Sequence, residues 1–379
     1  METVQDAPGP CRNCRGTDAA PVVQMDIGQV AGAAFQTHRT RPKMKVLFCH
    51  PLPFSLAHGG AQTVTQSLMR VLPELGVEVE PLKWWDEQQR GDIIHYITRP
   101  PIADVRMAHK KGLKVVVTEF LDAPASRNAV QLFVQRIIIL AARKLAGGFT
   151  ERLAWDVYRE ADALVYAVPR EWAVARYLFG APAGRGHIIG HGLDAGAIQA
   201  LSRPAPEEDY LLSIASIAPR KNSTLLAQAA RLSQTPVLFI GKPYSESDIY
   251  FQQFKQLVDG KWVRYAGFVT EEEKRAYLVR ARGFVLLSRF ESGCVAVYEA
   301  AAAGLPLLLS DLPWATSAYP HGPRLQFQKL GGAKSVAAGL SAFYKTARRT
   351  PGTMTFPVPD WKEIGRKYLA VYEKVLQDN

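Results

Sequence analysis

Two glutamates lie eight positions apart where a glycine-containing loop leads into an apolar helical segment. Glu291 belongs to the loop, together with Gly293, and Glu299 lies in the helix that follows. The first turn of a helix has free backbone N–H groups, which can bind phosphate oxygens. A carboxylate near each end of such a site can accept hydrogen bonds from sugar or ribose hydroxyls. The pair therefore predicts a ligand with both kinds of group, as in a nucleotide sugar.

The surroundings of Glu299 distinguish this hypothesis from a simpler one, in which both glutamates are surface acids beside a buried helix. The chain neighbours of Glu299 include Val295, Val297 and Ala300, so its carboxylate lies where burial is expected. A buried carboxylate without partners is costly. We therefore favour the binding-site interpretation.

Two cations precede the helix expected at residues 223–232. Arg220 and Lys221 stand near the start of this helix, where the positive end of the helix dipole disfavours cations. A solvated cap region is the alternative, but a bound anion explains both cations better.

The glycine pair Gly59 and Gly60 lies between the first expected strand and the first expected helix. This is the position of a phosphate-binding glycine loop, although taken alone the pair indicates only a flexible turn. His58 is the histidine near enough to this loop to be a candidate, whereas His50, His95 and His191 fit core or loop positions.

An alternation of short apolar runs and helical segments must position these residues. Unbroken apolar runs are typical of parallel strands buried on both faces. A first series of runs, at 45–49, 93–96, 115–117 and 164–166, alternates with helical segments such as 63–72. A second series has strands at 211–215, 236–240, 262–265, 283–287 and 305–309, and helices at 223–232, 271–281 and 295–303. The pattern predicts an α/β protein with two Rossmann-like, doubly wound parallel-sheet domains that face a central cleft.

The composition along the chain suggests where these domains begin and end. Residues 1–43 lack periodicity and are expected to form a flexible N-terminal extension. The first Rossmann-like domain is expected at 44–203 and the second at 204–359, after a polar, proline-containing connector. The last segment, 360–379, is expected to form a helix that packs back on the first domain.

Taken together, the motifs resemble those of retaining GT-B glycosyltransferases, most closely family 4, from Met44 to the C-terminus. The Glu291–Glu299 pair is similar to the glutamate-x7-glutamate motif of that family. Three further segments resemble its N-terminal glycine loop, its hinge signature and its donor-phosphate segment: Gly59-Gly60-Ala61-Gln62, His191-Gly192-Leu193-Asp194 and Pro219-Arg220-Lys221-Asn222.

The resemblance implies a metal-independent, hexosyltransferase-type glycosyltransferase that moves a sugar from a nucleotide-sugar donor to a glycan, lipid-linked or small-metabolite acceptor. The first domain would bind the acceptor and the second the donor. Glu291 would bind hydroxyls of the donor sugar and Glu299 the ribose, while Lys221 and Arg220 would neutralise the diphosphate. The remaining donor-binding candidates are backbone groups: Gly59 and Gly60, which would approach the donor closely, and Gly293, Cys294 and Val295, which would donate N–H groups.

Two positions depart from the family pattern. Ser216 follows Ala215 where the family usually has Gly-Arg, so Ser216 and Arg220 are the donor-site candidates there. Glu119 lies where the family often has a histidine; it either takes the polar catalytic role or is structural, and Asp122 ranks below it. These departures motivate an alternative function, a catalytically impaired GT-B protein that binds sugar nucleotides.

No cofactor or metal is expected, because the donor is a substrate and the chain has no Asp-x-Asp sequence for chelating a diphosphate-bound metal. Lysine and backbone donors can stabilise the charge without one. Cys11 and Cys14 have the spacing of half a zinc knuckle, but no second pair follows, so a metal site there is not favoured.

The formal net charge of +11 favours acidic partners. Nucleic acid is not expected, because no nucleic-acid-binding motif is present. No apolar run is long enough to cross a bilayer and the N-terminus has no secretory-signal pattern, so a cytoplasmic protein is expected. The segment 129–145 is apolar and basic. We favour an ordinary core helix there; the alternative is a helix on an anionic membrane surface, which would place the protein at the inner membrane face.

Overall fold

The computed structural model describes residues 44–55, 59–145 and 151–378. Two earlier expectations, the flexible extension over 1–43 and the role of His58, concern residues outside these ranges. Cys11 and Cys14 also lie outside them. The described residues all belong to one compact unit, Pro42–Asn379.

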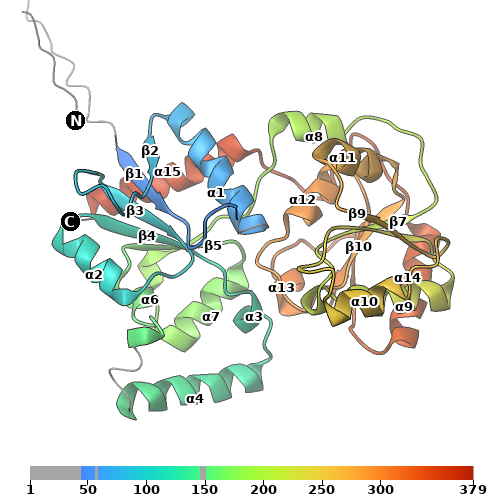
Figure 1. The fold of residues 1–379 in the computed structure, drawn as a ribbon, viewed down its shortest axis with the longest axis horizontal. Coiled ribbons are helices and arrows are strands. Elements are labelled where there is room, and N and C mark those ends of the chain that lie inside the picture. Colours follow the sequence, from blue (N-terminus) through green and yellow to red (C-terminus); the bar gives the residue numbers. More distant parts are fainter. Residues whose placement is uncertain (1–43, 56–58, 146–150, 379) are drawn as a thin grey trace, which may run out of the picture. The chain divides into compact units, whose positions relative to one another are not determined.

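The first sheet has six parallel strands in the order β2-β1-β3-β4-β5-β6 within the described residues (Figure 1). These strands are β1 Lys45–Cys49, β2 Glu78–Pro81, β3 Ile93–Ile97, β4 Lys114–Glu119, β5 Ala163–Tyr166 and β6 Gly186–Ile188. The central strands are rich in apolar residues and mostly buried because helices cover both faces of the sheet. The order reverses direction between β1 and β3, which creates a topological switch point.

The second sheet also has six parallel strands in the described residues, in the order β12-β11-β10-β7-β8-β9. They are β7 Leu211–Ile214, β8 Val237–Ile240, β9 Val263–Gly267, β10 Gly283–Leu286, β11 Leu307–Ser310 and β12 Leu325–Gln328. Counted within this sheet from β9, the order is 3-2-1-4-5-6, which is that of dinucleotide-binding folds, with the switch point between β7 and β10.

Helices cover both faces of each sheet (Figure 1). On the first sheet, α2, α6 and α7 share one core and α1 and α15 another. On the second sheet, α8, α11, α12 and α13 share one core and α9, α10 and α14 the other. The bounds are α1 Gly60–Val71, α2 Ile102–Lys110, α3 Asp122–Ala125, α6 Val157–Glu160, α7 Pro169–Phe179, α8 Ala195–Leu201, α9 Ser223–Ser233, α10 Ile249–Lys255, α11 Glu271–Arg280, α12 Val295–Ala302, α13 Pro313–Thr316, α14 Ala333–Thr346 and α15 Trp361–Gln377. The two-domain Rossmann-like architecture expected from the sequence is thereby confirmed.

The C-terminal helix α15 returns to the first sheet and anchors a buried histidine. The Tyr372 hydroxyl lies 2.7 Å from His95 Nδ1 and Thr118 Oγ1 lies 2.8 Å from His95 Nε2. Burial lowers the pKa of His95 to about 3, so the ring is neutral at physiological pH. The chain passes between the two sheets twice, and the two crossings pair where Leu193 N donates to Pro359 O and Trp361 N to Leu193 O.

Helix α4, Ala129–Leu145, corrects an expectation from the sequence. We expected an ordinary core helix, but only Leu132 and Ile139 of its 17 residues are buried. It packs along α7 at the edge of the first domain (Figure 1). Most of its large apolar side chains are exposed. Periodicity alone missed this because the outward and inward faces are both apolar. Within the described residues, no helix is both long and apolar enough to span a bilayer.

Candidate active site

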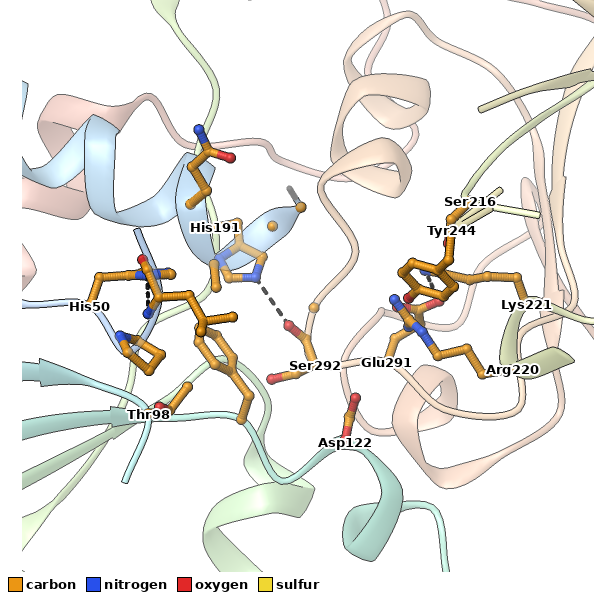
Figure 2. Close-up of a pocket in the computed structure, with 18 of the residues that line it drawn as sticks. His50, Thr98, Asp122, His191, Ser216, Arg220, Lys221, Tyr244, Glu291 and Ser292 are labelled. Atoms are coloured by element: carbon orange, nitrogen blue, oxygen red, sulfur yellow. Dashed lines mark hydrogen bonds and ion pairs between the residues drawn. The ribbon is translucent and has the colours of Figure 1, made fainter. Parts of the chain in front are cut away.

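A cavity of about 770 Å³ lies where the carboxyl ends of the two sheets meet (Figure 2). His50 follows β1 and Thr98 follows β3, so the switch point of the first sheet supplies one wall. Ser216 follows β7 and Glu291 follows β10, so the switch point of the second sheet supplies the other. Ligands of open α/β sheets bind in the crevice outside such strand ends. The topology therefore places the cavity where a ligand is expected.

Glu291 is the acid of the second wall, and two cations hold it. Its side chain is 7% exposed and forms an ion pair with Lys221, whose side chain is 8% exposed. Arg220 NH1 lies 3.3 Å from the second carboxylate oxygen of Glu291. Figure 2 shows Arg220, Lys221 and Tyr244 gathered around this carboxylate. Burial lowers the pKa of Arg220, but Glu291, Tyr244 and Asp122 outweigh it and raise that pKa above its ordinary value.

The backbone of two segments, about seventy residues apart in the sequence, brings Glu291 together with Arg220 and Lys221. The Pro219–Lys221 segment forms one 3₁₀ turn, which Asn222 closes in the left-handed conformation at φ 58°. Asparagine tolerates that conformation better than most residues. Arg289 N then donates to Arg220 O at 2.7 Å and ties the turn to the Glu291 loop. Lys221 is thereby placed against Glu291 before any ligand binds.

Gly59 and Gly60 line the opposite wall, at the start of α1. Gly59 has a φ of 143°, a conformation that side chains rarely adopt, which explains the glycine there. The first turn of α1 has no acidic residue and no capping side chain. Its N–H groups are therefore a place where an anion can bind.

Thr98 lies in the same wall and has a φ of 71°. This is an outlier for a β-branched residue, and such strain is concentrated at functional sites. Its N–H donates to Thr118 O at 2.7 Å, which holds the conformation.

His191 fixes the loop that carries Glu291. Its Nε2 donates to the carbonyl oxygen of Ser292 at 3.1 Å, and burial lowers the pKa of the ring (Figure 2). Gly293 has a φ of 65°, and a Cβ there would lie 2.9 Å from His191 Nε2. The glycine in the motif is therefore required both by conformation and by the close approach of this ring.

Seven of the eleven site residues predicted from the sequence line this cavity: Glu291, Lys221, Arg220, Gly59, Gly60, Ser216 and Gly293. The other four, Glu119, Glu299, Cys294 and Val295, are among the described residues but do not line it.

Glu119 is engaged by protein groups on both oxygens. The Tyr158 hydroxyl donates to Oε2 at 2.8 Å and Phe120 N donates to Oε1 at 3.0 Å. Burial raises the pKa of this carboxyl. The geometry favours the structural alternative for Glu119. Three residues later, Asp122 lines the cavity instead.

Glu299 has a protein partner that the sequence argument did not foresee. Lys274 Nζ of α11 lies 2.7 Å from its Oε1, and the Glu299 side chain is 12% exposed. Burial raises the pKa of this carboxyl, and Lys274 opposes the shift. A ribose is therefore not needed to compensate the charge of Glu299. At the start of α12, Cys294 N donates to the Tyr319 hydroxyl at 3.1 Å, so this N–H already has a protein acceptor.

Among the cavity residues that were missed or ranked low from the sequence are His50, Thr98, Asp122, Lys242 and Tyr244. Each follows closely on a strand of one of the two sheets. The rule that sites lie beyond the carboxyl ends of parallel strands could have found them. The lining contains three cationic residues, Lys242, Arg220 and Lys221, and two acidic ones, Asp122 and Glu291. Cationic residues therefore outnumber acidic ones around the cavity. Such a cavity suits an anionic ligand.

Glu171 is expected to make the stability of the folded protein depend on pH. It is fully buried at the start of α7, and Val168 N donates to its Oε2 at 3.3 Å. Burial raises its pKa to about 8, against smaller opposing effects of Ser292 and the backbone of Val168. An unfolded glutamate titrates near 4.3, so between about pH 4.5 and pH 8 the folded state keeps a proton that the unfolded state loses. The stability that the protonated Glu171 carboxyl gives the folded state is therefore full below pH 4.5 and is lost as the pH rises through 8.

We expect Glu171→Gln, which is permanently neutral, to remove that loss. Relative to wild type, its free energy of unfolding should rise from little change below pH 4.5 to a gain of about 2–4 kcal/mol at pH 8. Urea unfolding across this pH range measures the effect. Glu272→Gln, at an exposed position of α11, is the matched control and should follow wild type. A wild-type slope in the Glu171→Gln protein would show that Glu171 is ionised in the folded state.

The fold can now be compared with known proteins. Against the Anabaena protein HepE in complex with UDP and glucose, the structure gives a TM-score of 0.59 at 14% identity, covering 88% of this chain and 98% of that one. Sucrose-phosphate synthase from Thermosynechococcus elongatus gives a TM-score of 0.61 at 15% identity, covering 89% and 100%. The chain has the GT-B fold. At these identities, the likeness extends to the fold alone.

Sequence comparisons add two findings for the GT-B chain. Residues 197–322, which include the Arg220, Lys221 and Glu291 positions, match the family described as "Glycosyl transferases group 1". The O-antigen chain mannosyltransferase B of Escherichia coli is 30% identical over 111 residues, which are 28% of this chain and 29% of that protein. The match thus spans less than a third of the curated relative. Within the described residues, no group of three or more His, Cys, Asp or Glu side chains is placed to hold a metal ion.

Proposed function

We propose that this chain is a glycosyltransferase that moves a sugar from a nucleotide-sugar donor to an acceptor, with retention of configuration. One observation carries the proposal. Glu291 stands buried at the switch point of a sheet with dinucleotide-binding order, paired with Lys221 and Arg220, and faces a cavity of about 770 Å³. The matched group 1 segment contains all three residues.

Each part of this arrangement suits one part of a nucleotide sugar. The cationic groups of Lys221 and Arg220 would neutralise the diphosphate as negative charge develops on it when the glycosidic bond breaks. Glu291 would accept hydrogen bonds from the sugar hydroxyls, which fixes the anomeric carbon relative to the leaving group. The open N-terminus of α1 at Gly60 adds backbone donors from the other wall.

The acceptor would enter from the first domain. Its strand ends place Thr98 and His50 on the cavity opposite the Glu291 group, and Asp122 nearer to that group (Figure 2). For Glu299, we retain binding of the ribose as part of the proposal, through the oxygen that is not paired with Lys274. Because Lys221, Arg220 and Lys242 can supply the positive charge, we propose that transfer needs no divalent ion.

A ligand screen tests the proposal and identifies the donor. The protein is heated with UDP-, GDP-, ADP- and TDP-sugars, with and without EDTA, and nucleotide release is then measured for any sugar nucleotide that binds. A ligand that binds only the folded state stabilises it by about 2.7 kcal/mol at 100-fold excess over Kd. We expect one base to raise Tm by a few degrees, to be turned over, and to do so equally in EDTA.

Three outcomes would contradict parts of this proposal. Binding of no nucleotide sugar would exclude the donor site. Tight binding without nucleotide release under any acceptor would favour a GT-B protein that binds sugar nucleotides but has lost catalysis. Loss of turnover in EDTA would show that a metal ion is required.

A further inference from the structure

The outward face of α4 is a continuous apolar surface. Among the eighteen large hydrophobic side chains that are strongly exposed in the described residues, seven belong to this one helix. They are Val130, Phe133, Val134, Ile137, Ile138, Leu140 and Leu145, with exposed fractions from 45% to 86%. Scattered single hydrophobic residues are normal on a surface, but contiguous ones mark an interaction site. We call these seven residues the α4 apolar face.

The spacing of the α4 apolar face follows the helical repeat. At 3.6 residues per turn, the seven side chains lie within an arc of about 160°. The opposite side of the helix is anchored to the protein by Leu132 and Ile139, which enter the core of the first domain. The Arg136 guanidinium lies 4.5 Å from the ring centre of Tyr177, and Arg143 pairs with Asp156. The helix is therefore held in place with its second apolar side turned outward.

The segment that contains α4 carries charges of one sign, although Asp156, beyond the helix, pairs with Arg143. From Ala123 to Thr150 the sequence contains four cationic residues, Arg127, Arg136, Arg143 and Lys144, and no acidic residue. Lys144 is exposed near the end of the helix. A helix with one wide apolar face, cations and no acids has the properties of segments that lie in the interface of an anionic bilayer. A second copy of this chain would bring the same cations together, so charge complementarity favours a lipid surface.

We propose that α4 binds the surface of a membrane that contains anionic lipids, with the α4 apolar face inserted among the acyl chains. The helix lies in the plane of the interface and does not span it. Its first residue, Ala129, follows Asp122 of the cavity by only seven positions, which limits their separation to about 25 Å. Membrane contact would thus bring the cavity near lipid headgroups. The binding itself does not rest on the proposed glycosyltransferase activity.

Vesicle sedimentation with the full chain tests this proposal. We expect binding to vesicles of phosphatidylcholine with about 30% phosphatidylglycerol, weak binding to pure phosphatidylcholine, and weakening from about 0.1 M to about 0.5 M salt. Ile138→Glu should reduce the affinity for the anionic vesicles at least tenfold. The matched control is Leu232→Glu, because Leu232 is also a helical residue and its exposed fraction, 58%, is close to the 60% of Ile138. The control should bind as wild type does.

A second variant and a second measurement keep the interpretation unambiguous. Lys144→Glu should weaken binding to anionic vesicles while the thermal unfolding of the protein is unchanged. If wild type fails to bind anionic vesicles at low salt, or if Ile138→Glu and Leu232→Glu bind equally well, the proposal is wrong. If analytical ultracentrifugation without lipid finds a dimer that Ile138→Glu dissociates, α4 contacts a second copy and the membrane proposal is overturned.

Discussion

Replacing Glu291 by Gln is expected to lower kcat/KM for sugar transfer by about 10²–10³-fold, or about 2.7–4 kcal/mol of transition-state stabilisation. Glutamine keeps the size of the side chain but removes the negative charge that Lys221 and Arg220 hold in place. In our proposal this carboxylate binds the sugar as its bond to the diphosphate breaks. The loss should therefore appear in turnover, measured as release of nucleotide from the donor that the ligand screen identifies.

Binding of the nucleoside diphosphate provides the internal control for this experiment. Without the charge of Glu291, Lys221 and Arg220 remain available to the phosphates, so the affinity for the nucleoside diphosphate should be unchanged or higher. Glu246→Gln is the matched substitution, because Glu246 is exposed and follows the cavity residue Lys242 by four positions. It should retain full turnover. Wild-type turnover in a folded Glu291→Gln protein would remove the observation on which the proposed function depends.

Replacing Lys221 by Met is expected to lower the free energy of unfolding by about 2–4 kcal/mol. The side chains of Lys221 and Glu291 are 8% and 7% exposed, so the substitution leaves a buried carboxylate with Arg220 at 3.3 Å as its remaining cation. Removing one partner of a buried pair is costly because the other charge has already left water. Urea unfolding followed by circular dichroism measures the change.

A double-mutant cycle separates this cause from loss of packing. The Lys221→Met/Glu291→Gln protein has no uncompensated carboxylate, so it should be more stable than the sum of the two single changes by about 1–3 kcal/mol. Lys242→Met, at an exposed cavity cation that lies over the ring of Phe268, should change stability by less than about 0.5 kcal/mol. Additive effects of Lys221→Met and Glu291→Gln would mean that the two charges do not depend on each other for stability.

The central strands of both sheets could be predicted, whereas three of the four edge strands in the described residues could not; the exception is β9, expected at 262–265. Strands such as Lys45–Cys49 and Leu307–Ser310 are buried on both faces, so selection for burial leaves an apolar run that can be recognised. The three missed strands all lie at sheet edges: Glu78–Pro81, Gly186–Ile188 and Leu325–Gln328. An edge strand pairs on one side and tolerates polar side chains, so its sequence resembles a loop.

The sequence by itself determined the α/β class, the succession of two similar halves, and the Glu291, Lys221 and glycine-loop candidates. These features depend on local patterns, because helix and strand periods, helix starts and positive-φ glycines are properties of short segments. Resemblance to a family then connected candidates that are about seventy residues apart.

Only the tertiary structure decided which of the acids faces the cavity and which face of each helix is covered. Glu119 and Asp122 are three residues apart, yet the end of β4 buries one against Tyr158 and the start of α3 places the other on the cavity. Likewise, Glu299 forms an ion pair with Lys274 of another helix. Helix α4 has two apolar faces, and one of them is exposed. The physical reason is common to all three. Burial and ion pairing depend on which elements become neighbours, and the order of strands in the sheets sets those neighbours over distances that local sequence does not encode.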